Sequence, residues 1–413
     1  MTSKPNTAFV WFWLPGAVEP RVVGRLDSVG ESLIFTYGRN YLEAAGAVSL
    51  FTPELPLKRG RIPNPDGLLM PGVIRDGSPD AWGRRVILNA RLNRRGSDAE
   101  TSDLGELEYL LYSGSDRIGA LDFQESPDVY VEREYPKATL EELLESAERV
   151  EEGVPLSPAL DAALLHGTSI GGARPKALLD SDDAKFIAKF SSTSDTRDVV
   201  KAEYLTMRLA LRVGLDVSEV SLQRALGKDV LLIRRFDREL GADGWQRRQV
   251  VSALTILGLD EMMARYASYP DMAERIRHGF FEPESTLREL FSRMVFNVLC
   301  GNTDDHARNH AAFWDGELLA LTPAYDLCPQ PRSGNEASQA MLITEKSRES
   351  NVSTCIQAAH HFLLDEREAR QIIEAEIDAI HDAWDEICDE AELDSVQRRL
   401  LWGRQFLNPY SLR

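Results

Sequence analysis

The sequence predicts an α+β fold of two lobes, with a β-rich N-terminal lobe that carries an extra leading subdomain and an all-helical C-terminal lobe. Short runs of β-branched and aromatic residues, separated by Gly, Pro and Asp, recur up to Phe236. Beyond Asp237 the apolar residues recur mainly at helical spacing. The chain has 413 residues, which is too many for one small core. We therefore expect three parts, which are residues 1–125, 126–236 and 237–413.

Charge and cysteine usage limit the classes of function. The net charge is −19, which argues against a surface that grips DNA or RNA throughout, because phosphate binding needs clustered Lys and Arg. The four cysteines form no C-x-x-C pair. This argues against a zinc site and a disulfide framework, and it fits a reducing compartment. The apolar run near the N-terminus is too short to span a bilayer, so we expect a cytoplasmic protein that does not contact a membrane.

The leading part, residues 1–125, is predicted to contain mostly short strands. F-V-W-F-W-L, V-V-G-R-L and S-L-I-F-T-Y-G are β-branched and aromatic runs bounded by turn residues. Ser78 and Pro79 predict the start of a helix, because Ser can cap it and Pro is favoured in its first turn. A second helix is expected over residues 104–112, and R-I-G-A-L-D-F is expected to close this part as a strand.

The middle part, residues 126–236, mixes helices and strands. A Thr-x-x-Glu pattern from Thr139 predicts a capped amphipathic helix, and a further helix is expected from Pro158 to about Leu165. The runs K-A-L-L-D, K-F-I-A-K-F, V-S-L-Q-R-A-L and D-V-L-L-I-R-R are strand-like. Between the second and third of these runs lies a helical pattern, for which Gly214 is the expected stop.

A glycine-rich segment, H-G-T-S-I-G-G-A-R-P-K, precedes the first of those strands. Gly167, Gly171 and Gly172 allow the backbone to approach a ligand closely, with room for phosphate oxygens. Lys189 then ends a strand, and Glu203 lies early on the following helix. Protein kinases use a Gly-rich hairpin, a strand Lys and a helix Glu around the ATP phosphates. Taken alone, each feature leaves open a plain turn or a solvated charge.

A polar stretch, T-D-D-H-A-R-N, follows an apolar helical run that ends at Cys300. Asp304 and Asn309 have the spacing D-x-x-x-x-N, and Asp326 follows a short strand-like run. Kinases space their chemistry in this way: an Asp accepts the proton of the attacking hydroxyl, an Asn holds one magnesium ion, and a later Asp holds metal under the phosphates. For this motif alone, a polar loop that caps helices is the alternative. The complete order of features favours a kinase.

Several of these motifs resemble the HipA family of serine/threonine kinases, which are toxins of bacterial toxin–antitoxin pairs. S-I-G-G-A-R-P-K resembles the family's S-x-x-G-A-x-x-K loop, F-I-A-K-F its phosphate-lysine strand and R-R-F-D-R its hinge. T-D-D-H-A-R-N resembles its T-D-x-H-x-K-N catalytic loop, and L-T-P-A-Y-D its L-x-P-x-Y-D metal segment. P-G-V-I-R-D-G-S-P-D-A-W-G-R-R and R-I-G-A-L-D-F resemble its leading subdomain. The resemblance covers nearly the whole chain.

The resemblance implies a two-lobed, protein-kinase-like HipA fold that uses ATP and Mg²⁺. Asp304 would be the catalytic base, Asn309 and Asp326 would hold magnesium, and Glu203 would support Lys189. The implied ATP-binding residues are Ser169, Ile170, Gly171, Gly172, Ala173, Lys176, Lys189, Arg234, Phe236, Asp237, His306 and Asn309.

The Gly-rich loop also carries the family's self-phosphorylation site, which Ser169 matches. Thr168 beside it is the alternative acceptor. In the family, phosphate at this position ejects the loop and silences the kinase, which is consistent with the negative charge and bulk that it adds.

The sequence departs from the family pattern at a few positions. Arg308 stands where Lys is frequent, and Asp305 where Gly is common. Arg keeps the charge but presents a planar fork. Asp305 adds a second carboxylate, so the choice of Asp304 as base rests on spacing. Pro175 stiffens the Gly-rich loop.

The resemblance further implies a protein substrate among translation factors, such as an aminoacyl-tRNA synthetase. It also implies a HipB-like helix-turn-helix antitoxin, through which the complex would contact DNA. Two alternatives remain. One is a small-molecule phosphotransferase of the same fold, and the other is a non-catalytic binding module. The presence of Lys189, Asp304, Asn309 and Asp326 argues against a module that needs none of them.

Overall fold

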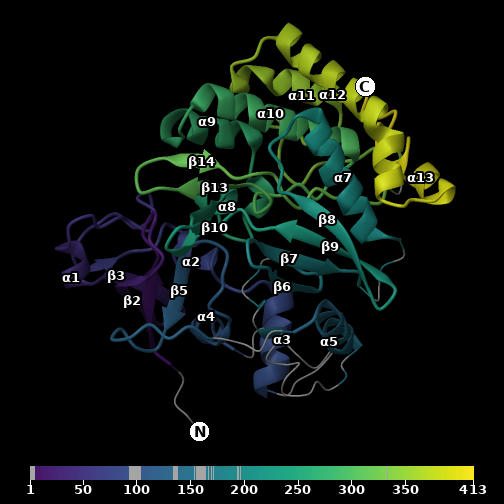
Figure 1. The fold of residues 1–413 in the computed structure, drawn as a ribbon. Coiled ribbons are helices and arrows are strands. Elements are labelled where there is room, and N and C mark those ends of the chain that lie inside the picture. Colours follow the sequence, from purple (N-terminus) through teal and green to yellow (C-terminus); the bar gives the residue numbers. More distant parts are fainter. Residues whose placement is uncertain are drawn as a thin grey trace. The chain divides into compact units, whose positions relative to one another are not determined.

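The computed structural model divides into two compact units of interleaved segments, shown as a ribbon in Figure 1. The structure describes residues 5–92, 104–133, 138–152, 154, 164–165, 167–168, 170, 172–192, 195, 197–332 and 334–413. Unit 1 comprises Met1–Thr196, Gln223–Val251 and Trp314–Glu317. Unit 2 comprises Arg197–Leu222, Ser252–Phe313 and Leu318–Arg413. The division into three parts stays a prediction.

Unit 1 begins with a five-stranded antiparallel sheet of order β4-β3-β2-β1-β5. Its strands are β1 (Thr7–Phe12), β2 (Arg21–Val29), β3 (Ser32–Tyr37), β4 (Arg61–Ile62) and β5 (Leu121–Gln124). Alternate residues of β1, Ala8, Val10 and Phe12, are buried, as the period of a strand requires. Gly24 in β2 has no room for a side chain, because a Cβ would lie 2.3 Å from the carbonyl oxygen of Thr36.

The helices of unit 1 are α1 (Arg39–Leu42), α2 (Gly72–Arg75), α3 (Ala81–Leu92), α4 (Glu106–Tyr112) and α5 (Leu140–Glu152). The expected start of α5 is confirmed, because Thr139 and Glu142 form the reciprocal bonds of a capping box. Trp82 on α3 packs in one core with apolar residues of α5 and of the second sheet. Most of the helix expected from Pro158 to Leu165 lies outside the described residues.

The second sheet of unit 1 has the strand order β6-β7-β9-β8. Its strands are β6 (Lys176–Asp180), β7 (Lys185–Phe190), β9 (Lys228–Arg234) and β8 (Val220–Ala225), and the hairpin β10 (Arg238–Gly241) and β11 (Gly244–Arg247) follows. β6 pairs with β7 so that Lys176 lies directly opposite Lys189. The second sheet therefore brings together two lysines that the sequence separates by one turn.

Unit 2 is mostly helical. Its main helices are α7 (Val199–Val213), α8 (Ala253–Ile256), α9 (Tyr269–Gly279), α10 (Pro283–Cys300), α11 (Val352–Ala358), η4 (Ala359–Phe362), α12 (Glu366–Glu390) and α13 (Ser395–Leu401). α10 is largely buried and contacts α9, α11, η4 and α12. α7 lies along α12, as Figure 1 shows. It ends at Gly214, which has a φ of 99° and confirms the expected stop.

The α+β composition agrees with the expected class, but residues 237–413 are not entirely helical. Besides β10 and β11, they contain β12 (Gln249–Ser252), β13 (Ala311–Trp314) and β14 (Leu319–Leu321). β13 pairs with β14. The run A-A-F-W is short and fully buried, and such runs suit a strand between polar loops better than a helix. Among the helices of the described residues, none has the length and apolar character needed to cross a bilayer.

Candidate active site

The buried helix α10 leads directly into the D-x-x-x-x-N loop of unit 2. The helix ends at Gly301, whose φ of 71° favours glycine. A Cβ there would lie 2.8 Å from the carbonyl oxygen of Gln405. Asn302 then donates its backbone N–H to the carbonyl of Asn297 at 2.9 Å and its side-chain amide to the Asn297 side chain at 2.9 Å. The start of the loop is therefore fixed on the helix.

The loop itself turns around the backbone carbonyl of Asp304. That oxygen accepts from the backbone N–H of His306 at 2.9 Å and from the Asn309 side chain at 3.2 Å. The Asp304 side chain is exposed. Because the amide NH₂ of Asn309 is used in this contact, its oxygen is the group left to bind a cation. The structure thus brings the predicted Asp and Asn together.

The neighbouring carboxylate, Asp305, is instead buried and hydrogen-bonded within the protein. It is 1% exposed, and its two oxygens bond to Tyr269 Oη and, at 2.7 Å, to His310 Nε2. Burial and the Asp305 carboxylate raise the pKa of Tyr269 well above its usual value, so Tyr269 is the donor. These contacts favour Asp304 as the reactive carboxylate, a choice that the sequence left to spacing alone.

Tyr269 and His310 are residues that the sequence analysis missed. They brace the loop from the side of Asp305, and Tyr269 precedes Asp305 by 36 residues. No spacing pattern indicates such a contact. A buried Tyr at the start of an amphipathic helix is ordinarily a core residue.

Asp326 lies at the end of a segment that is tied to the same loop. The hydroxyl of Tyr325 donates to the carbonyl of Arg308 at 2.7 Å. Ala324 pairs with the backbone of Val217. Asp326 has a φ of 59°, which is uncommon for a residue other than glycine, and such backbone is concentrated at functional sites.

The charges of this loop system interact. Partial withdrawal from water raises the pKa of Asp304 above its usual value, His306 opposes the shift, and the carboxylates of Asp326 and Asp305 add to it. A cation between Asp304 and Asp326 would relieve this repulsion. The donors expected to hold it, the Asp326 carboxylate and the Asn309 amide oxygen, are hard oxygen ligands of the kind that Mg²⁺ prefers. The residues therefore fit a magnesium ion.

Unit 1 holds the lysines predicted to bind phosphate. Lys176 and Lys189 are 4% and 9% exposed, and as direct cross-strand partners their side chains leave the same face of the sheet. The alternative that Lys189 is only a solvated surface charge is thus wrong. The register therefore places the two ammonium-bearing side chains together, which the sequence did not show.

The Gly-rich segment lies over Lys176. Gly172 has a φ of 108°, and a Cβ on it would lie 2.2 Å from the Lys176 Nζ. The backbone N–H of Gly172 donates to Asp80 Oδ2 at 2.6 Å, and the indole N–H of Trp82 donates to the carbonyl of Lys176 at 3.0 Å. The start of α3 thus anchors this loop, and a side chain at position 172 would be strained by this φ and would displace the ammonium group.

Of the two predicted self-phosphorylation positions, Thr168 is among the described residues and Ser169 is not. Ser169 and Gly171 lie outside the described residues. Thr168 is fully buried, donates its hydroxyl to the carbonyl of Leu165 at 2.7 Å and accepts from the Gly114 N–H at 3.1 Å. In this conformation the Thr168 hydroxyl is enclosed. Ile170 is buried and Ala173 is exposed.

In the hinge-like motif R-R-F-D-R, the charged side chains of Arg235, Asp237 and Arg238 are buried. Asp237 is 1% exposed. Its carboxylate accepts from Arg235, from Arg238 and from the N–H of Gly119. Because both oxygens are occupied, the Asp237 side chain is a buried counter-ion, and its expected contact with the nucleotide stays a prediction. Arg234 is exposed and Phe236 half-buried, and their roles stay predictions.

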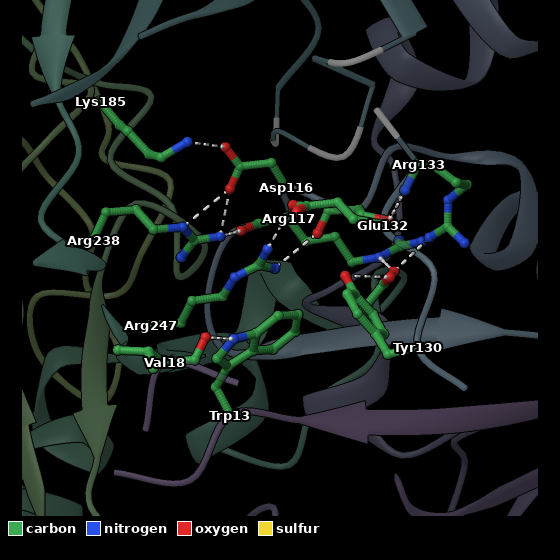
Figure 2. A network of polar contacts seen from close by, with 12 residues as sticks. Trp13, Val18, Asp116, Arg117, Tyr130, Glu132, Arg133, Lys185, Arg238 and Arg247 are labelled. Atoms are coloured by element: carbon green, nitrogen blue, oxygen red, sulfur yellow. Dashed lines mark hydrogen bonds and ion pairs between the residues drawn. The ribbon is translucent and has the colours of Figure 1, made fainter. Parts of the chain in front are cut away.

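The same network continues to Asp116. Figure 2 shows Asp116 between Lys185 and Arg238, with Arg247 nearby. The Arg238 guanidinium donates to Asp116 Oδ1 at 2.7 and 3.0 Å, and the Arg247 guanidinium lies 3.5 Å from the centroid of the Trp13 indole. Buried ion pairs need such additional bonds to offset their loss of hydration.

Glu203 on α7 is 3% exposed. The alternative that Glu203 is only a solvated surface charge is therefore also wrong. The predicted pairing of Glu203 with Lys189 stays a prediction.

Comparison with known proteins identifies the family. A model described as the HipA-like C-terminal domain matches residues 168–384, and the HipA N-terminal domain matches residues 17–124. The serine/threonine-protein kinase toxin HipA of Shewanella oneidensis is 27% identical over 184 residues, covering 38% of this chain and 42% of the relative. A protein of Sinorhizobium fredii named as a kinase, Y4mE, is 31% identical over 147 residues, covering 34% of this chain and 33% of the relative. The matches thus span less than half the length of these relatives.

A solved structure shows the same fold. HipA of Shewanella oneidensis MR-1, in a complex with HipB and its operator DNA, matches with a TM-score of 0.69 at 19% identity, over 97% of this chain and 99% of that one. The family model of the C-terminal domain spans more than half of the chain and includes the Gly-rich segment, the D-x-x-x-x-N loop and Asp326. The chain therefore belongs to the HipA family.

Proposed function

We propose that this HipA-family protein is a serine/threonine protein kinase that uses ATP and Mg²⁺. The observation that carries the proposal is the loop system of Asp304, Asn309 and Asp326. In it, one carboxylate is exposed, its neighbour Asp305 is occupied by Tyr269 and His310, and the charge of Asp326 acts on Asp304.

In this mechanism Asp304 accepts the proton of the attacking hydroxyl. Its raised pKa makes it a stronger base than an ordinary Asp, which suits proton transfer near neutral pH. Asn309 and Asp326 would hold Mg²⁺, which neutralises charge on the transferred phosphoryl group. Lys176 and Lys189 supply two ammonium groups for phosphate oxygens, and the backbone around Gly172 covers them.

The two lysines give a testable prediction. Lys176→Met and Lys189→Met should each weaken ATP binding by about 10–100-fold, because a hydrogen bond to a charged group contributes about 1.5–3 kcal/mol. Isothermal titration with ATP and Mg²⁺ measures this. Lys228→Met is the matched control, because Lys228 lies in the same sheet but is half-exposed and pairs with Glu148. An affinity equal to that of the control would contradict the role of the lysines.

We further propose that the kinase phosphorylates its own Gly-rich loop at Ser169. The enclosure of the Thr168 hydroxyl supports Ser169 over Thr168 as the acceptor. Phosphate there adds negative charge and three acceptor oxygens, which would disturb the packing around Gly172 and silence the enzyme.

For partners, we propose a HipB-like antitoxin that contacts DNA, and a cytosolic protein substrate such as an aminoacyl-tRNA synthetase. The family and the net charge of −19 support this arrangement, because DNA contact by the acidic chain itself would be unfavourable.

Intact-mass measurement after incubation with ATP and Mg²⁺ tests the proposal. The wild-type chain and Thr168→Ala should each gain one phosphate, and Ser169→Ala should gain none. A phosphate that persists in Ser169→Ala would reject this position. Absence of both phosphate and ATP binding in the wild type would reject the kinase. ATP binding without phosphate on the chain or on added protein would favour a small-molecule substrate.

A further inference from the structure

Two histidines and a glutamate gather at one place in unit 2. Glu345 lies in a turn, and His360 and His361 are neighbours in η4. One ligand atom from each residue lies within 4.8 Å of the other two. His361 Nε2 lies 2.9 Å from Glu345 Oε1, and the two imidazole centroids are 3.9 Å apart.

The orientation of the His360 ring suits a metal ion. His360 Nδ1 lies 2.9 Å from the carbonyl oxygen of Gln357. A ring that donates its Nδ1–H to a carbonyl keeps Nε2 as a lone-pair donor, and metal-binding histidines usually make such a second contact.

The backbone that carries the three groups is held in place before any ion binds. The turn around Glu345 is closed by bonds from the N–H groups of Ile343 and Thr344 to the carbonyl of Ser347, at 2.8 and 3.0 Å. On the other side, the guanidinium of Arg277 on α9 donates to the carbonyl of His361. The ligands therefore come from two fixed segments, and an ion would join them.

We propose that Glu345, His360 and His361 bind a divalent transition-metal ion of the Zn²⁺ class, with a fourth position left for water or another ligand. Two imidazoles and one carboxylate are a usual zinc donor set. Ligand atoms of a tetrahedral zinc ion, each about 2.0–2.1 Å from the metal, lie roughly 3.3 Å apart. The contact between His361 and Glu345 is already close to that spacing, and the other ligand atoms lie within 4.8 Å, so binding requires movements of at most about 1.5 Å.

This site differs from the one proposed for Mg²⁺, which prefers oxygen ligands in octahedral geometry. It also differs from the thiolate sites that the cysteine spacing argued against, because all four cysteines are buried. A bound ion would cross-link the turn at Glu345 to η4. It would thereby restrain the segment between Asp326 and α11.

The test uses the full chain without an affinity tag, freed of metal with a chelator and titrated with Zn²⁺ in a buffer that contains excess Mg²⁺. We expect one Zn²⁺ per chain with a Kd of about 1 µM or tighter. His361→Ala and Glu345→Gln should each weaken binding by about 10–100-fold. His278→Ala is the matched control, because His278 is exposed and pairs with Glu274 at 2.9 Å without a second imidazole. This variant should bind as the wild type does.

Two further measurements keep the test decisive. With Co²⁺ in place of Zn²⁺, the wild type should show the visible absorption of a tetrahedral nitrogen–oxygen site, and His361→Ala should lose it. Circular dichroism of the metal-free variants checks that they are folded. The proposal is overturned if the wild type fails to bind at about 100 µM Zn²⁺. It is also overturned if a folded variant with both His360→Ala and His361→Ala binds with unchanged affinity.

Discussion

Asp304→Asn is expected to lower kcat for phosphoryl transfer by about 10²–10⁴-fold, the usual contribution of a positioned general base. The amide cannot accept the proton, yet it keeps the size of the side chain. The loop should remain in place, because His306 and Asn309 bond to the backbone carbonyl of residue 304 and not to its side chain. Steady-state ADP release with saturating ATP and Mg²⁺ measures the effect, and ATP affinity should change little.

Asp305→Asn is the control for this substitution. Asp305 is bonded to Tyr269 and His310, so its replacement should lower the midpoint of thermal unfolding, which Asp304→Asn should not do. If Asp304→Asn kept kcat within about threefold of the wild type, the assignment of the base would be wrong.

Because the pKa of Asp304 is raised, the activity of the wild type and the stability of Asp304→Asn relative to it should both depend on pH. Only the ionised carboxylate accepts a proton, so the acid limb of kcat/KM should lie above the usual Asp pKa of about 3.9. Because the pKa in the folded state is raised, ionisation of Asp304 lowers stability as pH rises through that value. Asp304→Asn should therefore unfold at a higher temperature than the wild type at pH 7. The difference should vanish below the usual Asp pKa, which a series of thermal melts would show.

Asp116→Ala is expected to lower the free energy of unfolding by about 3–5 kcal/mol, the usual cost of removing one partner from a buried charge pair. Asp116 is 3% exposed and holds Arg238, Arg235 and Lys185. Burial alone would raise its pKa, but these cations hold the pKa well below its usual value. Without the carboxylate, buried cations lose their counter-charge. Denaturant titration followed by circular dichroism measures the loss.

Glu43→Ala is the matched control, because the Arg59–Glu43 pair is largely exposed and pairs of that kind contribute at most about 1 kcal/mol. The stabilisation by Asp116 is present above the pKa of an unfolded Asp and is lost as pH falls through the lowered pKa of the folded state. The difference between wild type and Asp116→Ala should therefore narrow in strong acid. Equal losses for the two variants at pH 7 would contradict a major role for the network.

The sequence predicted those features whose residues are close together along the chain. The α5 capping box, the Gly214 stop and the D-x-x-x-x-N turn follow from spacings of a few residues, and each lies where it was expected. The expected starts of α3 and α4 lie within about two residues of the observed ones, the usual uncertainty of helix ends. All-helical character after Asp237 was overestimated, because buried runs such as A-A-F-W are too short to show a period, and their length favours a strand.

What the sequence could not show are pairings between distant segments. Asp116 precedes Arg238 by 122 residues, and nothing local marks Asp237 as a buried counter-ion. The register that places Lys176 opposite Lys189 depends on which residues form the intervening turn. These contacts between distant segments can therefore be identified only from the structure.

The network around Asp116 also affects the order in which the chain can fold during synthesis. Arg235 and Arg238 donate to the carbonyl of Arg117, and Asp237 accepts from the N–H of Gly119. The leading sheet therefore lacks these partners until residue 238 has been made. At about 5–20 residues per second, this interval is roughly 6–24 s. During it, the first part of the nascent chain carries a carboxylate whose burial is not yet compensated, so unit 1 would complete its folding only after β9 and β10 have left the ribosome.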